Sequence, residues 1–316
     1  WLVEEHHAKV LNKDQHDLFI TSKSLKEVPA FLESFVLQHW TFDDDIQLAS
    51  KKYHPKRTVN VGEITIGGTT NNCHLIAGPC SVESEEQIRA VAEHLQSIGI
   101  KSIRAGAFKP RTSPYSFMGL EEEGLKLLAA VRESYGLNVV SEVRDATNVE
   151  LVLKYADVVQ IGTKSMYDHG ILNACGYSDK TILIKRGFGT TLQEFVQAAE
   201  FVMSRGNNNV VLCERGIRTF ESKTRFTLDL CGVAFLKHEC NLPIIVDPSH
   251  ALGARYGITD LSKAALAMEI DGLLIESHPN PDKALSDSAQ QITLESLTEL
   301  KNQLDPLALA LNLNLI

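Results

Sequence analysis

Eight short apolar runs recur along most of the chain, and they constrain its fold more than any other feature of the sequence. Neighbouring runs start 20 to 35 residues apart, and a strand, a crossover helix and two loops together need about 30 residues. Each run is almost continuously apolar, which is typical of parallel strands that are buried on both faces. The runs occupy residues 74–78, 102–106, 137–141, 157–161, 181–185, 209–213, 243–247 and 272–276.

The stretches between these runs carry helical signals. Ser84 starts a capping-box pattern ahead of apolar residues at helical spacing, and Thr191 caps another such stretch. Gly136 follows a third stretch, where a glycine commonly ends a helix. Eight strand–helix units predict an α/β protein with a (β/α)8 TIM barrel. The alternative is a doubly wound open sheet, but its usual Gly-rich turn does not follow the first strand.

The N-terminal region differs from the barrel region in its pattern. Residues 17–21 are predicted to form a strand, and a capping box at Ser24 predicts a helix over the apolar stretch that follows. Alternating residues in segment 58–68 predict a β-hairpin at the bottom of the barrel. We therefore expect a short βα appendage over residues 1–55, with a role in regulation or assembly, and a catalytic barrel over residues 56–316.

Composition excludes several classes of protein. The formal net charge is −9, which argues against a protein that coats nucleic acid with a basic face. No apolar run approaches the roughly 20 residues of a membrane span, and the first residues do not read as a signal peptide. We expect a cytoplasmic protein with neither nucleic acid nor membrane as partner. The six cysteines form no C-x-x-C pair, which argues against a thiolate zinc ribbon or a thioredoxin-type site.

The active site of such a barrel lies at the carboxyl ends of its strands, and cationic residues gather there in the sequence. A single basic residue is often only solvated surface charge. A cluster of this size suits an anionic substrate with two phosphates, or with a phosphate and a carboxylate. Its members are Arg104, Lys109, Arg111, Lys164, Lys185, Arg186 and Arg215.

A second set combines a thiol, an imidazole and two carboxylates: Cys80, His250, Glu276 and Asp287. They follow the first, seventh and eighth runs, and the first and eighth strands become neighbours when a barrel closes. These donors suit a divalent transition metal. Each also has a structural explanation, as a buried thiol, a hydrogen-bonded loop histidine or a solvated acid. The residues alone leave both explanations open.

Two other chemistries fit part of the pattern. Asp247, Ser249 and His250 are the residue types of a hydrolytic triad, but no G-x-S-x-G turn accompanies them. Lys185 could form a Schiff base, as in class I aldolases, with the adjacent Arg186 lowering its pKa. A Schiff-base enzyme has no use for the set of metal-type residues.

Six motifs appear in order and give the sequence a family resemblance. The sequence resembles the 3-deoxy-D-arabino-heptulosonate 7-phosphate (DAHP) synthases, specifically the microbial type I-beta branch, over residues 53–310. The motifs are IAGPCSV at 76–82, KPRTSPYSF at 109–117, LIKRGF at 183–188, LCERGIRTF at 212–220, VDPSH at 246–250, and IESHP at 275–279 with ALSD at 284–287.

The resemblance implies a (β/α)8 transferase that condenses phosphoenolpyruvate with erythrose 4-phosphate and releases phosphate, the first step of the shikimate pathway. It also implies a homo-oligomer, dimeric or tetrameric. The nearest alternative is 3-deoxy-D-manno-octulosonate 8-phosphate synthesis from arabinose 5-phosphate, a family that typically has KANR where this chain has KPRT at 109–112. A sugar-phosphate sensor without turnover is a more distant alternative.

The resemblance also assigns site residues. A divalent metal (Mn²⁺, Zn²⁺, Fe²⁺ or Co²⁺) is expected on Cys80, His250, Glu276 and Asp287, with no organic cofactor. The expected catalytic residues are Lys109, Glu142, Lys185 and His250. The expected substrate-binding residues are Arg104, Lys109, Arg111, Thr112, Lys164, Lys185 and Arg215.

The chain departs from the family pattern in two places. The family usually has arginine where this chain has Lys164, and lysine keeps the charge but lacks the bidentate fork. The N-terminal region is shorter than the ferredoxin-like regulatory domain that is common in this branch.

Overall fold

Eight parallel strands form a closed barrel in the computed structural model, which describes residues 1–13, 16–23, 25–109 and 115–316. The barrel strands are β5 (Asn72–Gly78), β6 (Ser102–Arg104), β7 (Asn138–Val143), β8 (Val158–Ile161), β9 (Thr181–Lys185), β10 (Val210–Glu214), β11 (Ile244–Val246) and β12 (Gly272–Glu276). Each strand pairs with the next, and β12 pairs with β5 to close the ring. The predicted barrel is therefore confirmed.

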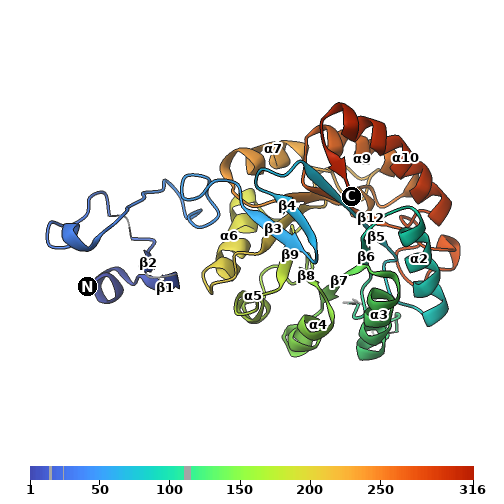
Figure 1. The fold of residues 1–316 in the computed structure, drawn as a ribbon, viewed down its shortest axis with the longest axis horizontal. Helices are drawn as coiled ribbons and strands as arrows, with labels where there is room; N and C mark the ends of the chain where they lie inside the picture. Colours follow the sequence, from blue (N-terminus) through green and yellow to red (C-terminus); the bar gives the residue numbers. More distant parts are fainter. Residues whose placement is uncertain (14–15, 24, 110–114) are drawn as a thin grey trace.

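Helices surround the strands (Figure 1). They are α2 (Glu85–Ser97), α3 (Glu121–Tyr135), α4 (Val149–Tyr155), α5 (His169–Gly176), α6 (Leu192–Met203), α7 (Leu230–Glu239), α8 (Pro248–Leu252), α9 (Ile258–Ala267) and α10 (Leu294–Ala310). The sequence signals lie where they were expected. Ser84 accepts a hydrogen bond from the Gln87 backbone at 3.1 Å, Thr191 forms a capping box, and Gly136 is the left-handed C-cap of α3.

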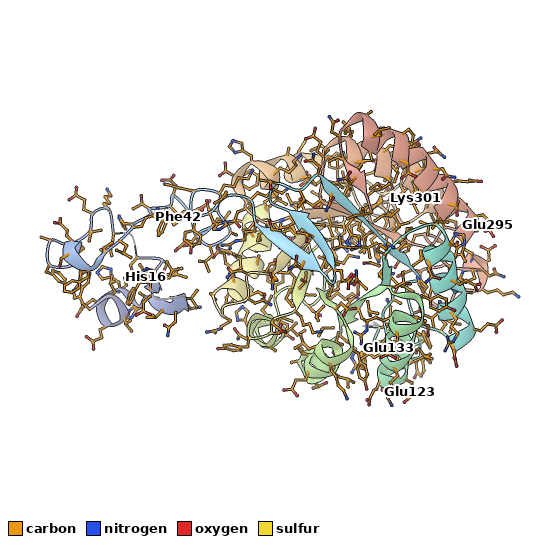
Figure 2. All side chains as sticks on the ribbon, viewed as in Figure 1. His16, Phe42, Glu123, Glu133, Glu295 and Lys301 are labelled. Atoms are coloured by element: carbon orange, nitrogen blue, oxygen red, sulfur yellow. The ribbon has the colours of Figure 1, made fainter. Side chains whose placement is uncertain are left out.

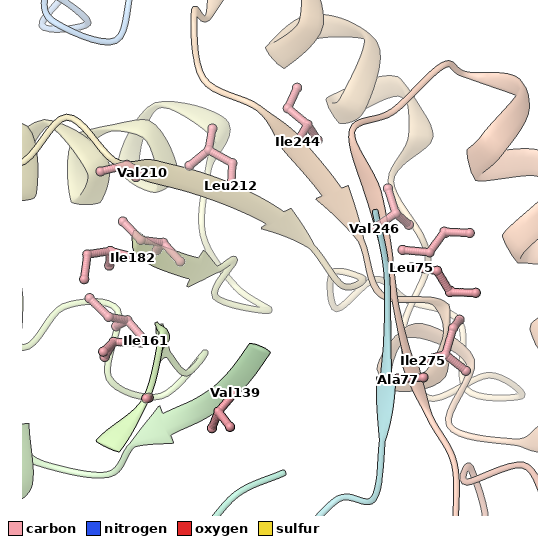
Figure 3. Packing of buried hydrophobic residues seen from close by; sticks show 14 of the residues in the cluster. Leu75, Ala77, Val139, Ile161, Ile182, Val210, Leu212, Ile244, Val246 and Ile275 are labelled. Carbon is pink, nitrogen blue, oxygen red and sulfur yellow. The ribbon is translucent and has the colours of Figure 1, made fainter. Parts of the chain in front are cut away.

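Both faces of the strands are buried, as the continuous apolar runs predicted. On β5 and β12, Leu75, Ala77 and Ile275 belong to the cluster between the strands and the helices, part of which Figure 3 shows. Ile76 and Leu274 alternate with them and belong to a separate cluster inside the barrel. The barrel interior is thus a packed core, and polar residues are left to its two ends.

A hairpin closes the amino-terminal end of the barrel. Strands β3 (Thr58–Val61) and β4 (Ile64–Gly67) pair antiparallel across a two-residue turn, as predicted. The apolar side chains Val59, Val61 and Ile66 join the cluster inside the barrel. Thr181, the first residue of β9, donates its hydroxyl to the Asn60 carbonyl. The hairpin therefore lies at the end opposite the predicted active site.

The appendage contains helix α1 (Leu2–His6) and a hairpin of β1 (Lys9–Lys13) and β2 (His16–Ile20). Figures 1 and 2 show that it extends away from the barrel, with His16 and Phe42 far from α3 and α10. The strand predicted at 17–21 is β2. The helix predicted after Ser24 was wrong: residue 24 lies outside the described residues, and the following stretch holds only one 3-10 turn, η1 (Glu33–Phe35).

The missing helix has a physical reason. Phe31 is 60% exposed and Phe35 is 80% exposed, so the described part of the chain leaves uncovered the apolar face that a helix here would present. A short helix without tertiary packing is only marginally stable in water.

The segment that joins the appendage to the barrel is packed against it. On α6, the Glu200 carboxylate accepts the backbone N–H groups of Gln47 at 2.7 Å and Ala49 at 2.8 Å. Asn241 donates to the carbonyl of Leu48 at 2.9 Å. Ile46, Leu48 and Ala49 are buried. At the other end of the chain, β13 (Asn314–Leu315) pairs with the start of β5.

Among the described residues, no helix is both long enough and apolar enough to cross a lipid bilayer.

Candidate active site

Strand ends bring the predicted site residues to the carboxyl end of the barrel. Arg104, Lys185 and Glu276 are the last residues of β6, β9 and β12. The register of the closing pair places Glu276 opposite Gly78, two residues before Cys80. The closure of the barrel therefore joins groups that are almost 200 residues apart in the sequence.

The four residues of the predicted metal set lie together. One ligand atom from each of Cys80, Glu276 and Asp287 lies within 4.8 Å of the other two. The Cys80 thiol donates to Asp287 Oδ2 at 3.1 Å, and His250 Nε2 lies 3.5 Å from Glu276 Oε1. A thiol and two carboxylates within 4.8 Å of one another, with the His250 imidazole beside one of the carboxylates, fit the coordination preferences of a divalent transition metal.

Asp247 holds His250 in place. It is the N-cap of α8, where its Oδ1 accepts the His250 backbone N–H at 2.9 Å, and its Oδ2 lies 2.7 Å from His250 Nδ1. Lys185 Nζ contacts the same Oδ2 at 2.5 Å. Burial alone would raise the pKa of Asp247, but His250 and Lys185 hold it well below its usual value. The ionised carboxylate directs Nε2 of the imidazole towards Glu276.

Two cations contact the predicted ligands. Arg104 Nη1 pairs with Glu276 Oε1 at 2.5 Å, and both side chains are almost fully buried. Lys109 Nζ lies 3.1 Å from Cys80 Sγ and 3.0 Å from the Cys80 carbonyl. Burial raises the pKa of the Cys80 thiol to about 12, and Glu276 adds to the effect. A metal on this thiol would therefore have to displace its proton.

In the part of the chain that the structure describes, Arg215 has no salt-bridge partner although it is 4% exposed. Among the described residues, its Nε and Nη1 have no hydrogen-bond partner, and its guanidinium lies 4.3 Å from the centre of the Phe226 ring. Burial lowers its pKa. A buried guanidinium with free donors is costly by itself and suits an anionic ligand.

Arg186 differs from its predicted role at the mouth of the barrel. Its Nη1 pairs with Glu214 and with Asp229, each at 2.8 Å, and its Nη2 donates to the Thr190 carbonyl. These contacts satisfy its charge within the protein. Arg186 therefore ties β10 to the start of α7, and two carboxylates balance its charge, although its Nε has no hydrogen-bond partner among the described residues.

Two of the remaining predicted residues lie on strand β7 and in the loop after β8. Glu142, on β7, accepts a hydrogen bond from Gln160 at 2.8 Å. Lys164 is exposed in the loop after β8. Arg111 and Thr112 lie outside the described residues.

The comparisons with known proteins agree with this arrangement. The sequence profile of the DAHP synthetase I family matches residues 47–311. The chain belongs to this family. It is similar to the phospho-2-dehydro-3-deoxyheptonate aldolase of Thermotoga maritima, with 44% identity over 266 residues that cover 84% of this chain and 78% of the relative. The resemblance to the DAHP synthases is therefore confirmed, and the chain is an aldolase-type transferase.

A solved structure and a second relative are also similar to the chain. The crystal structure of DAHP synthase from Thermotoga maritima matches this one with a TM-score of 0.85 and 38% identity, covering 100% of this chain and 94% of that one. The 2-dehydro-3-deoxyphosphooctonate aldolase of Syntrophotalea carbinolica is 32% identical over 259 residues, which cover 76% of this chain and 92% of that protein.

Sequence reasoning missed three residues beside the predicted ligands of this DAHP synthetase family member. Gln290 donates to Glu276 Oε2 at 2.5 Å, Gln291 accepts the Cys80 backbone N–H at 2.9 Å, and Arg225 donates to Gln290 Oε1 at 2.6 Å. The available signal was the pair of glutamines that begins three residues after the end of the ALSD motif, both of which are buried.

Proposed function

We propose that the chain condenses phosphoenolpyruvate with erythrose 4-phosphate to give DAHP and phosphate, the first step of the shikimate pathway. In this reaction C3 of phosphoenolpyruvate bonds to the aldehyde carbon, water adds at C2, and phosphate leaves with the electrons of the C2–O bond. The observation that carries the proposal is Arg215, a buried guanidinium at the same barrel end as the metal-type residues, whose Nε and Nη1 have no hydrogen-bond partner among the described residues.

The proposed site includes a divalent metal held by Cys80, His250, Glu276 and Asp287. When bound, such an ion supplies Lewis-acid polarisation of an aldehyde oxygen. The donor set supports this part of the proposal, because three of the four residues already place ligand atoms within 4.8 Å of one another.

The cationic side chains would bind and orient the substrates. We assign the phosphate and carboxylate of phosphoenolpyruvate to Arg104, Lys109, Lys185 and Arg215, with Lys164 at the rim. Fixing both ends of this molecule would point C3 at the aldehyde and lower the entropic part of the barrier. Glu142 would stand near the reacting double bond. Arg111 and Thr112 would hold the phosphate of the aldose.

The chain is further proposed to work as a cytoplasmic homo-oligomer, with residues 1–55 as an appendage for regulation or assembly. The barrel over residues 56–316 would carry the catalytic residues, since every assigned residue lies within it.

The alternative acceptor is arabinose 5-phosphate, since a relative with 32% identity is a 2-dehydro-3-deoxyphosphooctonate aldolase. Against it, this chain has KPRT at 109–112, as the DAHP synthases do. Pro110 restricts the backbone, so it should set the reach of Arg111 to a four-carbon sugar.

Consumption of phosphoenolpyruvate with each sugar, in the presence of Mn²⁺, tests the proposed function. We expect the rate with erythrose 4-phosphate to exceed that with arabinose 5-phosphate by at least about tenfold, or roughly 1.4 kcal/mol. Arg111→Ala should raise the KM of the aldose far more than that of phosphoenolpyruvate. Equal or faster turnover of arabinose 5-phosphate would reassign the activity, and no turnover with either sugar would favour a sensor.

A further inference from the structure

Two consecutive glutamines, Gln290 and Gln291, reach from one loop to the predicted metal set. Gln290 donates to the side chain of Glu276, Oε2, at 2.5 Å. The side chain of Gln291 binds backbone groups instead. Its Oε1 accepts the Cys80 N–H at 2.9 Å, and its Nε2 donates to the Ser286 carbonyl at 2.7 Å. Both glutamines are buried. Gln290 therefore contacts Glu276 directly, and Gln291 fixes the backbone at Cys80 and beside Asp287.

The orientation of the Glu276 carboxylate is set from both sides. Arg104 contacts Oε1 at 2.5 Å and Gln290 contacts Oε2 at 2.5 Å. The backbone N–H of Glu276 also donates to Ser249 Oγ at 3.0 Å. Protein groups alone therefore determine the plane of this carboxylate.

The loop that carries Asp287 needs support of this kind. Asp287 has a φ of 46°, in the left-handed region that side chains other than glycine adopt at a cost. The Gln290 N–H closes the turn by donating to the Asp287 carbonyl at 3.2 Å. On the other side, Gln291 binds the carbonyl of Ser286. The backbone of Gln290 and the side chain of Gln291 thus hold Asp287 in its left-handed conformation.

Arg225 fixes which way the Gln290 amide faces. Its Nη1 donates to Gln290 Oε1 at 2.6 Å and lies 3.8 Å from Asp287 Oδ1. Because a guanidinium only donates and a carboxylate only accepts, the amide oxygen must face Arg225 and the NH₂ must face Glu276. In this orientation the oxygen and the NH₂ of the Gln290 amide both have hydrogen-bond partners, and in the flipped orientation neither would.

We propose that Gln290 and Gln291 are positioning residues that preset Cys80, Glu276 and Asp287 for a divalent metal, and that Arg225 locks Gln290. This inference rests on the metal site of the proposed function. Outer partners of this kind typically change metal affinity by about 10- to 100-fold.

The test is a Co²⁺ titration of the metal-stripped full chain, followed by the thiolate-to-cobalt absorption band. Loss of the band in Cys80→Ser identifies the site that the band reports. We expect Gln290→Met and Gln291→Met each to weaken Co²⁺ binding by about 10- to 100-fold and to change the shape of the spectrum. Arg225→Met should have a smaller effect, because Gln290 keeps its bond to Glu276.

Gln303→Met is the matched control. Gln303 lies on α10, where it accepts a hydrogen bond from Lys263 at 2.7 Å, so this variant should bind Co²⁺ like the unmodified chain. Should Gln291→Met fail to fold, Gln290→Met and Arg225→Met still decide the matter.

Unchanged affinity and an unchanged spectrum in the glutamine variants, beside a normal Cys80-dependent band in the unmodified chain, would overturn this inference alone. Absence of that band from the unmodified chain would overturn the metal site of the proposed function, and this inference with it.

Discussion

Two buried arginines at the same end of the barrel show how partners decide the role of a residue. Arg186 is paired with Glu214 and Asp229, whereas Arg215 keeps two donor atoms without a partner among the described residues. A paired buried charge supports the fold, and its loss leaves the partner charges buried alone. A buried charge with free donors is costly in the ligand-free protein, and an anionic ligand would offset that cost.

Replacing each of these two arginines by methionine should therefore affect activity and stability in opposite ways. Arg215→Met should lower kcat/KM for phosphoenolpyruvate about 100-fold, since one or two charge-assisted hydrogen bonds of about 1.5–3 kcal/mol would be lost. Its free energy of unfolding should not fall. Arg186→Met should lower the free energy of unfolding by about 3–5 kcal/mol. Steady-state kinetics and urea denaturation give the two quantities.

Arg218→Met is the control, because Arg218 is an exposed arginine of the same loop that stacks on Phe188. The assignment of Arg215 to substrate binding would be wrong if both loop variants had the same kcat/KM for phosphoenolpyruvate.

At this scale the strand pattern predicts the residues that are tied to strand ends, and the motifs add loop residues such as Cys80 and Asp287. Arg104 and Glu276 follow from the strand pattern, because a strand end in a barrel always faces the same mouth. The role of Gln291 could not be predicted. It depends on how a loop returns to Cys80, and no periodicity encodes that contact.

At the scale of elements, the segment from residue 46 to residue 57 packs against the barrel and makes its contacts there. Glu200 binds its backbone, and burial raises the pKa of this carboxyl even though three backbone N–H groups and Arg57 oppose the shift. Arg57 donates to Asn241 at 3.1 Å and to the Leu48 carbonyl at 3.2 Å. The predicted division at residues 55 and 56 cuts through this set of contacts.

Two truncated chains separate the appendage from this segment. A chain that begins at Asp45 should keep the stability and the specific activity of the barrel. A chain that begins at Lys56 loses the buried side chains of Ile46 and Leu48, at about 1.5–3 kcal/mol each as an upper value. We expect a lower melting temperature but activity per folded molecule that is largely kept.

Equal melting temperatures for the two truncated chains would show that the segment does not stabilise the barrel. An inactive but folded Asp45 chain with an unchanged oligomeric state would show that the appendage contributes to the site.

The predictions of strands and helices were correct where each element packs within the repeating strand–helix arrangement of the barrel. The strands and their helices follow from apolar periods that the barrel geometry requires. The helix after Ser24 did not form although its capping signal was good, because local signals are weak without a surface to cover. Exposure of Phe35 and Leu37 reflects that missing surface.

Across the whole molecule, apolar groups fill the middle of the barrel and the predicted site residues gather at its carboxyl end. His74 lies away from that end, a fully buried histidine on β5 whose register partner on β12 is Gly272. Neither of its ring nitrogens has a hydrogen-bond partner among the described residues. Burial lowers its pKa to about 3, so the folded protein keeps this ring neutral well into the acid range.

This buried ring should make the entire barrel sensitive to acid. In the unfolded chain His74 takes up a proton near its ordinary pKa of about 6.5, whereas the folded chain does not until about pH 3. The unfolded state therefore gains stability as the pH falls below about 6.5. The free energy of unfolding should drop by about 2 kcal/mol from this group between pH 7.5 and pH 5.

In His74→Met this part of the loss should vanish, while His238→Met, which removes an exposed histidine, should follow the unmodified chain. Urea denaturation at each pH measures the differences, and the effects of all other groups cancel between variants. Parallel stability profiles for His74→Met and the unmodified chain would mean that the interior of the barrel already accommodates the protonated ring.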